Sequence, residues 1–222
     1  MTPQVASALK SADDTRSRLI QAAGEVFADV GYHAATVRDI CKRAGANVAA
    51  VNYHFGDKLK LYTEVLRQAV CIESDQAPPF LLDFECTPQD KLAVFVKRVL
   101  RGTNDPARPA WATRLMLHEM AQPTPSLGGV IEEIIRPKYD LLRRLIGEVL
   151  NVPADHRATH LCAHSIIGQV RHYAIGRCVT SRLWPELEFT PDSLDQIAGH
   201  ITRFSMAGLK EVKKSLGTGN KK

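Results

Sequence analysis

The sequence predicts an all-α protein of about nine helices, and three observations lead to this fold class. Apolar residues recur every three or four positions along most of the 222 residues, and no segment shows the convincing alternation of a half-buried strand. Capping residues, glycines and prolines bound most of these periodic segments. The connections between them are short, which is typical of packed helices.

Three short helices are predicted near the N-terminus. The first has an apolar stripe that includes Leu19, Ala23 and Phe27. In the second, Thr36 and Asp39 have the spacing of a capping box, which satisfies the free amides of a helix start. The expected starts and stops are Asp13 or Asp14 with Gly31, Thr36 with Gly45, and Asn47 with Gly56.

The remaining helices are longer and are separated by proline-rich breaks. Thr87 and Pro88 open one of them, since proline is tolerated in the first turn of a helix. Pro137 lies inside a long apolar-periodic segment, so we expect a kink there. These helices cover about 57–74, 87–101, 111–120, 130–149, 155–176 and 193–214.

The pattern divides the chain into four parts. We expect a disordered arm at 1–12, a small three-helix domain at 13–56, a larger helical domain at 57–214 and a disordered tail at 215–222. The three N-terminal helices are too short to be stable alone, so the helix that Asp57 caps is expected to tie them to the rest.

Composition excludes several classes of protein. No apolar run approaches the length of a membrane span, and the N-terminus lacks a secretory signal, so we expect a cytoplasmic protein without a membrane partner. The 5 cysteines are odd in number and form no Cys-x-x-Cys pair, which argues against a disulfide framework or zinc ribbon. The net charge of +5 permits nucleic-acid binding without showing it.

Residues 36–55 have the layout of a helix-turn-helix motif, with a short glycine-containing turn between two helices. Ala44 and Ala50 are small where the two helices cross, and Ile40 and Val51 are apolar where the pair buries a face. In such a motif the second helix enters the major groove of DNA.

The segment TVRDICKRAGANVAAVNYHFGDKLKLY resembles the N-terminal domain of the TetR family of transcriptional regulators. The resemblance covers about residues 15–70 and implies, for the remainder, only an all-α regulatory and dimerisation domain. The shorter segment NVAAVNYHFG is similar to a branch that includes YbiH-like regulators. Asn52 stands where the family usually has tyrosine. The matching positions are Thr36, Ile40, Ala44, Gly45, His54, Phe55, Lys58 and Leu61.

The resemblance implies a ligand-responsive transcriptional regulator, most often a repressor, that binds a palindromic operator in double-stranded DNA as a homodimer and is released by a small hydrophobic effector; whether this chain represses or activates stays open at this point. Helix N-termini and basic side chains would bind phosphates, while the first turn of the second helix would meet base edges. Phe27 and Phe55 are expected in the core. The predicted DNA-binding residues are Thr36, Arg38, Lys42, Asn47, Val48, Ala49, Asn52, Tyr53, His54 and Lys58.

Effector and dimer sites are predicted in the C-terminal two thirds. Apolar pockets orient a guest with a few polar groups, and aromatic residues and histidines on the central helices could provide them, although the same residues could be core. The resemblance implies dimerisation through the last two long helices, whose apolar faces could instead close the monomer core. The candidates are Trp111, Met116, His118, Tyr139, His164 and Tyr173 for the effector, and Gly168, Ile197, Ile201 and Phe204 for the dimer.

Other functions remain open. His156, His160, His164 and His172 are spaced by four, four and eight residues, which leaves a metal-responsive regulator as an alternative, but no cysteine or acid joins them at ligand spacing. We therefore predict no metal ligands and no cofactor. An all-α enzyme is not expected, because no nucleophile elbow, phosphate loop or persuasive carboxylate pair is present. A protein-binding helical adaptor is a further alternative.

Overall fold

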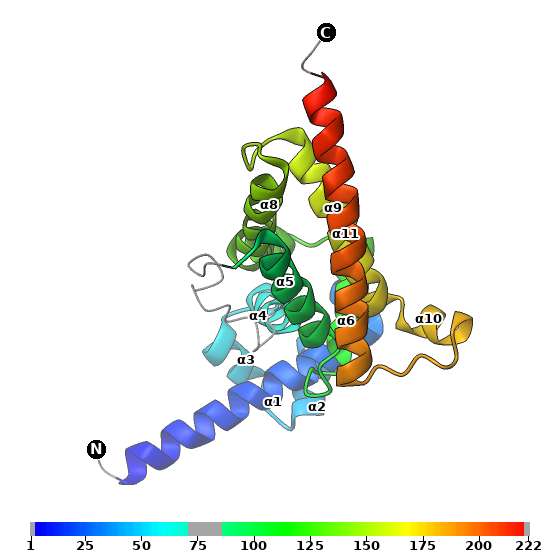
Figure 1. Cartoon of the computed structure of the whole chain (residues 1–222). Helices are drawn as coiled ribbons and strands as arrows, with labels where there is room; N and C mark the ends of the chain where they lie inside the picture. Colours follow the sequence, from blue (N-terminus) through cyan, green and yellow to red (C-terminus); the bar gives the residue numbers. More distant parts are fainter. Residues whose placement is uncertain (1–2, 71–85, 220–222) are drawn as a thin grey trace. The chain divides into compact units, whose positions relative to one another are not determined.

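The computed structural model describes residues 3–70 and 86–219, and it confirms the predicted all-α class (Figure 1). Within these ranges the chain forms helices and their connections, and no strand. None of the described helices is long and apolar enough to cross a membrane. The predicted break at 75–86 falls almost entirely outside the described residues, as does Cys71.

The helices form two compact units. The first comprises Met1–Cys71 and Pro109–Ile135, and the second comprises Ile72–Arg108 and Arg136–Lys222. This grouping differs from the division expected at residue 57, because Lys58–Val70 and Pro109–Ile135 share a core with the N-terminal helices. The chain therefore passes between the units three times.

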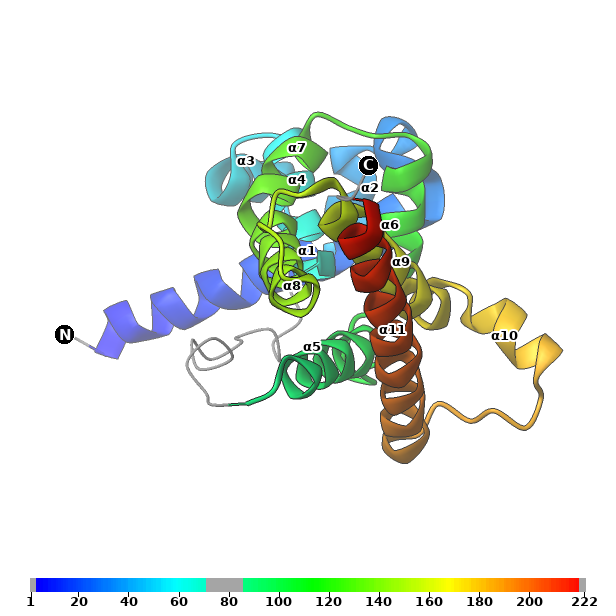
Figure 2. The same ribbon diagram turned by 45° about the horizontal axis from the view of Figure 1, so that its top comes forward.

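The first unit contains the predicted helix-turn-helix. Its core includes Leu19, Phe27, Ile40, Val51 and Trp111, so α6 contributes to the same core as the N-terminal helices. In Figure 2, α7 lies beside α4, in agreement with their contacts. The elements are α1 (Pro3–Ala34), α2 (Val37–Ala44), α3 (Val48–Phe55), α4 (Lys58–Val70), α6 (Trp111–Ala121), α7 (Ser126–Val130) and the π-helical turn η3 (Ile131–Ile135).

A disordered arm was expected at 1–12, whereas the backbone of residues 3–12 is helical and continuous with the rest of α1. The reason is that the segment contains strong helix formers such as alanine, leucine and lysine, and no glycine, so the helix extends toward the N-terminus. Gly31, the expected stop, has a positive φ of 77° and interrupts α1 one turn before it ends at Ala34.

The second unit is built around apolar faces from four long helices, with a core that includes Leu92, Leu100, Leu142, Ile166 and Ile201. Its elements are α5 (Pro88–Thr103), α8 (Arg136–Leu150), α9 (Arg157–Ile175), α10 (Arg177–Leu183) and α11 (Pro191–Gly219).

Three details of the second unit were not predicted. The tail at 215–222 was expected to be disordered, but residues 215–219 continue α11, because the helix keeps packing through Val212 and Leu216; residues 220–222 lie outside the described part. The short helix α10 occupies an expected loop. The cap of α9 is His156, whose Nδ1 accepts a hydrogen bond from the Ala158 amide at 3.1 Å.

The turn η3 comes immediately before Arg136 and Pro137. Proline has no amide hydrogen, and its ring clashes with the preceding helical turn. A widened π turn relieves that clash, which explains the local irregularity at the point where the sequence predicted a kink.

Candidate nucleic-acid interface

The two helices of the motif begin at the N-cap residues that the sequence predicted, Thr36 and Asn47. The Thr36 hydroxyl accepts a hydrogen bond from the Asp39 amide at 3.1 Å and donates to the Asp39 carboxylate at 2.6 Å. At the start of α3, Asn47 Oδ1 accepts from the Ala49 amide at 3.0 Å. Because α2 and α3 have only 8 residues each, these caps are a substantial part of their local stability.

The turn between α2 and α3 depends on a left-handed glycine. Gly45 has φ 60° and ψ 38°, a conformation that costs other residues about 1 kcal/mol or more. Arg18 of α1 donates to the carbonyl oxygen of Ala44 at 3.1 Å, which satisfies one of the last acceptors of α2. The turn is thus fixed both by its own backbone and by a side chain from α1.

The inner faces of α2 and α3 are packed as predicted. Ile40 and Val51 are completely buried, and Phe27 and Phe55 lie in the core of the first unit. Cys41 is also buried among these residues, and burial raises the pKa of its thiol, so it is apolar filling. With these side chains turned inward, the opposite face of the motif is exposed.

The exposed face holds most of the predicted DNA-binding residues. Tyr53 is 81% exposed and Val48 is 44% exposed. The other exposed members of the predicted set are Thr36, Arg38, Lys42, Asn47, Ala49 and Asn52. The structure therefore leaves these side chains accessible to a nucleic acid, and their contacts with DNA stay a prediction.

The basic residues of α2 are not equivalent. Arg43 lies 3.2 Å from the Asp29 carboxylate and 3.5 Å from that of Glu25, so it joins α2 to α1. Within the described part of the chain, Arg38 and Lys42 have no ion-pair partner. These two residues are accordingly the ones available to phosphate groups.

His54 and Lys58 are less accessible than the rest of the set. Both are half-buried, and the Lys58 ammonium lies 4.5 Å from the centre of the Tyr32 ring in a cation–π contact. Burial lowers the pKa of Lys58 below its usual value. Lys58 is the first residue of α4, so its ammonium is held at the start of that helix.

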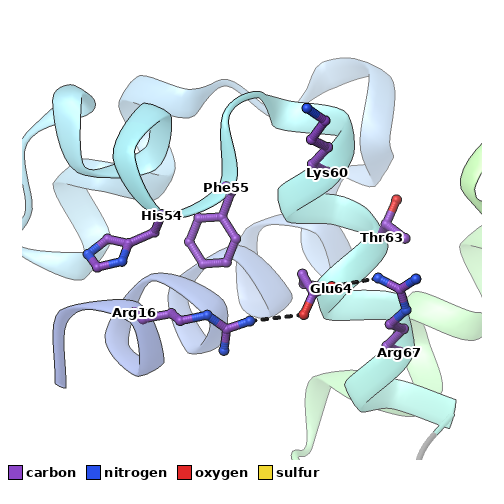
Figure 3. A pocket seen from close by; sticks show the side chains of 7 residues that line it. All are labelled: Arg16, His54, Phe55, Lys60, Thr63, Glu64 and Arg67. Atoms are coloured by element: carbon purple, nitrogen blue, oxygen red, sulfur yellow. Dashed lines mark hydrogen bonds and ion pairs between the residues drawn. The ribbon is translucent and has the colours of Figure 1, made fainter. Parts of the chain in front are cut away.

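A pocket of about 470 Å³ lies beside the motif, between α1, the end of α3 and α4 (Figure 3). Glu64 bridges two guanidinium groups across it, at 2.9 Å from Arg16 and 2.6 Å from Arg67. Lys60 and His54 also line the pocket. The Glu64 bridge joins α1 to α4, and sequence reasoning missed it because residues 16 and 64 are 48 positions apart, with α2 and α3 between them.

A buried polar cluster joins α4 to α6 and to the loop before α7. The fully buried Glu119 carboxylate accepts from the Tyr62 hydroxyl at 2.6 Å, and from the Thr124 amide and hydroxyl at 2.8 and 2.9 Å. Burial, and then the contact with Glu119, raises the pKa of the Tyr62 hydroxyl far above its usual value. The hydroxyl oxygens of Thr63 on α4 and Ser126 on α7 also lie 2.7 Å apart.

Helix α6 also packs closely on α1. The Trp111 indole is buried, donates to Gln21 Oε1 at 3.0 Å, and lies so close to Gly24 that a Cβ there would be 2.2 Å from the ring. Arg114 pairs with Asp29 at 3.1 Å. The segment Trp111–Ile135 is therefore firmly attached to the helices that carry the helix-turn-helix.

The six candidate effector residues are divided equally between the two units. Trp111, Met116 and His118 belong to the first unit, where Trp111 is core, Met116 is partly buried against that core and His118 is exposed. Tyr139, His164 and Tyr173 belong to the second unit. Within the second unit Tyr139 and His164 are brought together, with the Tyr139 hydroxyl 3.4 Å from His164 Nε2.

The four spaced histidines have local partners, and His160 and His164 share one of them, the Tyr139 hydroxyl. His156 caps α9, His160 Nδ1 lies 2.8 Å from the Tyr139 hydroxyl, and His172 Nε2 lies 3.3 Å from the Thr180 hydroxyl. Among the described residues no group of three or more histidine, cysteine or acidic side chains could hold a metal ion. The spacing therefore gives no support to the metal-responsive alternative.

The candidate dimer residues divide by exposure. Ile197 and Ile201 are buried in the core of the second unit, so they have little surface to offer a partner. Phe204 is 65% exposed, and Gly168 is exposed with open space beside it. For the two isoleucines the alternative holds: their side chains pack in the core of the monomer.

Comparison with known proteins agrees with this geometry. The N-terminal domain of the bacterial regulatory proteins of the TetR family matches residues 19–65. The C-terminal domain of the HTH-type transcriptional dual regulator CecR matches residues 88–209, more than half of the chain. The chain belongs to the TetR family, with a CecR-type C-terminal domain. It is thus a DNA-binding transcriptional regulator and not an enzyme.

Individual relatives cover different parts of this TetR-family chain. It is 26% identical to the dual regulator CecR of Shigella flexneri over 174 residues, which are 74% of this chain and 78% of that protein. It is 47% identical to the transcriptional activator FasR of Mycolicibacterium smegmatis over 93 residues, 42% of this chain and 34% of that one. The crystal structure of FadR from Bacillus subtilis with stearoyl-CoA shares the fold, with a TM-score of 0.62, 17% identity and coverage of 86% and 98%.

Proposed function

We propose that this regulator is a ligand-responsive repressor that binds a palindromic operator as a homodimer. The observation that carries the proposal is the exposed face of α2 and α3. There, two capped helices present Asn47, Val48, Ala49 and Asn52 outward, while their apolar sides are fully buried. A short, rigid helix with small exposed residues fits the major groove closely.

Base readout would depend on a small number of contacts. Val48 and Ala49 offer only apolar contact, for example to a thymine methyl group. The Asn47 side chain already accepts from the Ala49 amide. Asn52 is exposed and polar on the same helix, so it is the residue that we propose reads a base directly.

Phosphate contacts would come from both sides of the reading helix. The first amides of α2 can bind an anion, because helix N-termini favour negative charge. Arg38 and Lys42 on α2, Tyr53 and His54 near the end of α3, and Lys58 at the start of α4 would add charge or hydrogen bonds. Such contacts supply affinity but little sequence preference.

Two copies are needed because one short helix reads only half of an operator. Regulators of this family act as dimers. A palindromic site would place the two reading helices about 34–36 Å apart, one turn of DNA. We propose that exposed residues of α9 and α11, including Gly168 and Phe204, face the second copy.

The effector would act on DNA affinity through α6, α7 and α4. The segment Pro109–Ile135 is joined to the second unit by the chain at both of its ends, and it is bonded to α4 through Glu119 and Tyr62. A change in the second unit would thereby shift α4, whose first residue is Lys58. A coupling of only about 1–3 kcal/mol would alter operator affinity by about 5–150-fold.

The first test is a mobility-shift titration on the DNA upstream of the protein's own gene, repeated at several salt concentrations. We expect Lys58→Ala to weaken binding to all sequences alike and to flatten the salt slope by about one unit. Lys213→Ala, an exposed lysine on α11, is the matched control and should leave the slope unchanged. Failure to bind any palindrome at low salt would refute the proposal.

Asn52→Ala distinguishes base readout from phosphate contact. A selection of binding sites with this variant should give a relaxed preference at one base position, with a loss of about 1–3 kcal/mol for the preferred base. Uniform weakening on every sequence would show that Asn52 does not read a base.

Repression and the effector need separate measurements. The names of two relatives are those of a dual regulator and of an activator, so the direction of control is tested by transcription in vitro with and without the protein. A thermal-shift screen of hydrophobic small molecules tests for an effector, because a ligand of the native state raises the melting temperature. Hits should also weaken operator binding, and Tyr139→Phe should reduce their effect if that residue contacts them.

A further inference from the structure

The second unit carries an exposed apolar arm to which the function proposed above gives no role. The arm consists of α10 and the segment that returns to α11, residues 177–190. Both ribbon views show α10 projecting away from α9 and α11 (Figures 1 and 2). Its large apolar side chains face solvent, since Val179 is 50%, Leu183 79% and Trp184 52% exposed.

The arm is held firmly at its base. At Gly176 the backbone approaches so closely that a Cβ would lie 2.5 Å from the His172 carbonyl oxygen. The buried Thr180 hydroxyl donates to the Gly176 carbonyl oxygen at 3.0 Å. The Arg177 guanidinium lies 4.5 Å from the centre of the Phe189 ring. These contacts fix the direction in which α10 leaves α9.

The return segment is anchored as well. Leu187 is buried in the core of the second unit, and the Ser193 hydroxyl bonds to the Glu188 carbonyl oxygen at the start of α11. With both ends fixed, the exposure of Leu183 and Trp184 is a property of the folded unit. Three large apolar side chains, Val179 and Leu183 on α10 and Trp184 at its C-cap, would normally be covered.

We propose that this arm docks against a second copy of the chain and extends the dimer interface. The inference rests on the homodimer of the proposed function. It is supported by position, because α10 connects α9 with α11, the two helices that carry the exposed Gly168 and Phe204. A second copy bound to those helices lies at the base of each arm.

Charge also favours a second copy over a different partner. Arg177 and Arg182 lie on α10, whereas the exposed Glu186 and Glu188 lie on the return segment. In a two-fold interface the same patch meets itself in the opposite direction. The basic half of one arm then faces the acidic half of the other, around an apolar centre formed by Leu183 and Trp184, which is the usual composition of an interface core and rim.

The test uses the fluorescence of the chain's 2 tryptophans, Trp111 and Trp184. Trp111 is 1% exposed within one protomer, whereas Trp184 is half exposed. Iodide quenching is measured from nanomolar to micromolar protein, while sedimentation follows the dimer fraction. The Trp184→Phe variant supplies the signal of Trp111 alone for subtraction. We expect Trp184 to be open to iodide in the monomer and shielded in the dimer.

A substitution provides the second measurement. The double variant Leu183→Ser, Trp184→Ser should raise the dimer dissociation constant by about tenfold or more, as expected for apolar anchors of an interface. Val94→Ser on α5 removes a comparably exposed aliphatic side chain and should leave the constant unchanged. If the double variant fails to fold, the quenching of the wild-type protein still decides.

Three outcomes would overturn the proposal. They are a dimer in which Trp184 remains as open to iodide as in the monomer, an unchanged dimer constant in the folded double variant, and a protein that stays monomeric throughout. Loss of DNA binding with a normal, arm-dependent dimer would count against the proposed function alone. If Trp184 remains open to iodide in the dimer, the arm would instead be free for a different partner.

Discussion

Removing the bond between Tyr62 and Glu119 is predicted to uncouple α4 from α6. The buried Glu119 carboxylate accepts three hydrogen bonds, one from Tyr62 at 2.6 Å and two from Thr124 at 2.8 and 2.9 Å. Tyr62→Phe removes one bond to a carboxylate, and the expected loss of stability is about 1.5–3 kcal/mol. Glu119→Ala leaves three donors without their acceptor, and we expect a loss of about 3–6 kcal/mol.

These losses are large against the total stability of a typical protein, about 5–15 kcal/mol. Glu119→Gln is the milder variant, because its amide oxygen can still accept from Thr124. The variants are compared by urea unfolding in a Trp184→Phe background, where Trp111 is the single remaining tryptophan. Trp111 is buried in the core of the first unit, so its emission follows the unfolding of that unit and not of the whole chain.

A double-mutant cycle of Tyr62→Phe with Glu119→Gln isolates the bond itself. We expect a coupling energy of about 1–2 kcal/mol, and additive effects for Tyr62→Phe with Asp195→Asn, a substitution in the second unit. Each variant of the pair should also weaken operator binding at a temperature where the protein is folded, because Lys58 begins the same helix as Tyr62. A coupling energy below about 0.3 kcal/mol would refute the account of how α4 and α6 are joined.

Three further predictions concern other parts of the chain. Gly24→Ala should destabilise the first unit by about 1–3 kcal/mol or more, since the new Cβ would lie 2.2 Å from the Trp111 ring; a melting temperature equal to that of the wild type would contradict this packing. Asn47→Ala should cost about 1 kcal/mol through the lost cap of α3, while Asn47→Ser should restore most of it; urea unfolding measures both, and equal losses would exclude a capping role. Hydrogen bonds from Lys97 and Arg101 hold the pKa of Asp195 below its usual value, so its stabilising effect is complete above the ordinary carboxyl pKa and is lost as the pH falls through the lowered one. Asp195→Asn should therefore flatten the acid side of the stability profile, and an unchanged profile would rule out this contribution.

Much of the fold follows from local sequence signals. Thr36, Asn47 and Thr87 cap helices as predicted, and Gly45 takes the left-handed conformation expected of a helix stop. These features depend on neighbouring residues only, so spacing alone reveals them. The short helix α10 escaped prediction because its seven residues are too few for a clear periodic pattern, and its apolar side chains face solvent instead of the core.

The candidate interface could be predicted to the level of which residues face outward. The capping pattern of α2 and α3, together with the apolar positions Ile40 and Val51, settles which side of each helix is buried. The partners of the charged residues could not be predicted in this way. Arg43 is held by Asp29 and Glu25, whereas Arg38 on the same helix projects outward, and that difference arises only when α1 packs against α2.

The sequence by itself determined the helical class, the helix-turn-helix and the family resemblance, because each rests on short-range periodicity, caps and a contiguous motif. Only the tertiary structure decided that α6 and α7 belong with the DNA-reading helices, since Trp111 meets Gly24 and Glu119 meets Tyr62 across long stretches of chain. It also decided that Ile201 is core while Phe204, three residues later, is exposed. A helical stripe shows that a face will be buried, but the packing of other helices determines which residues of that face are covered.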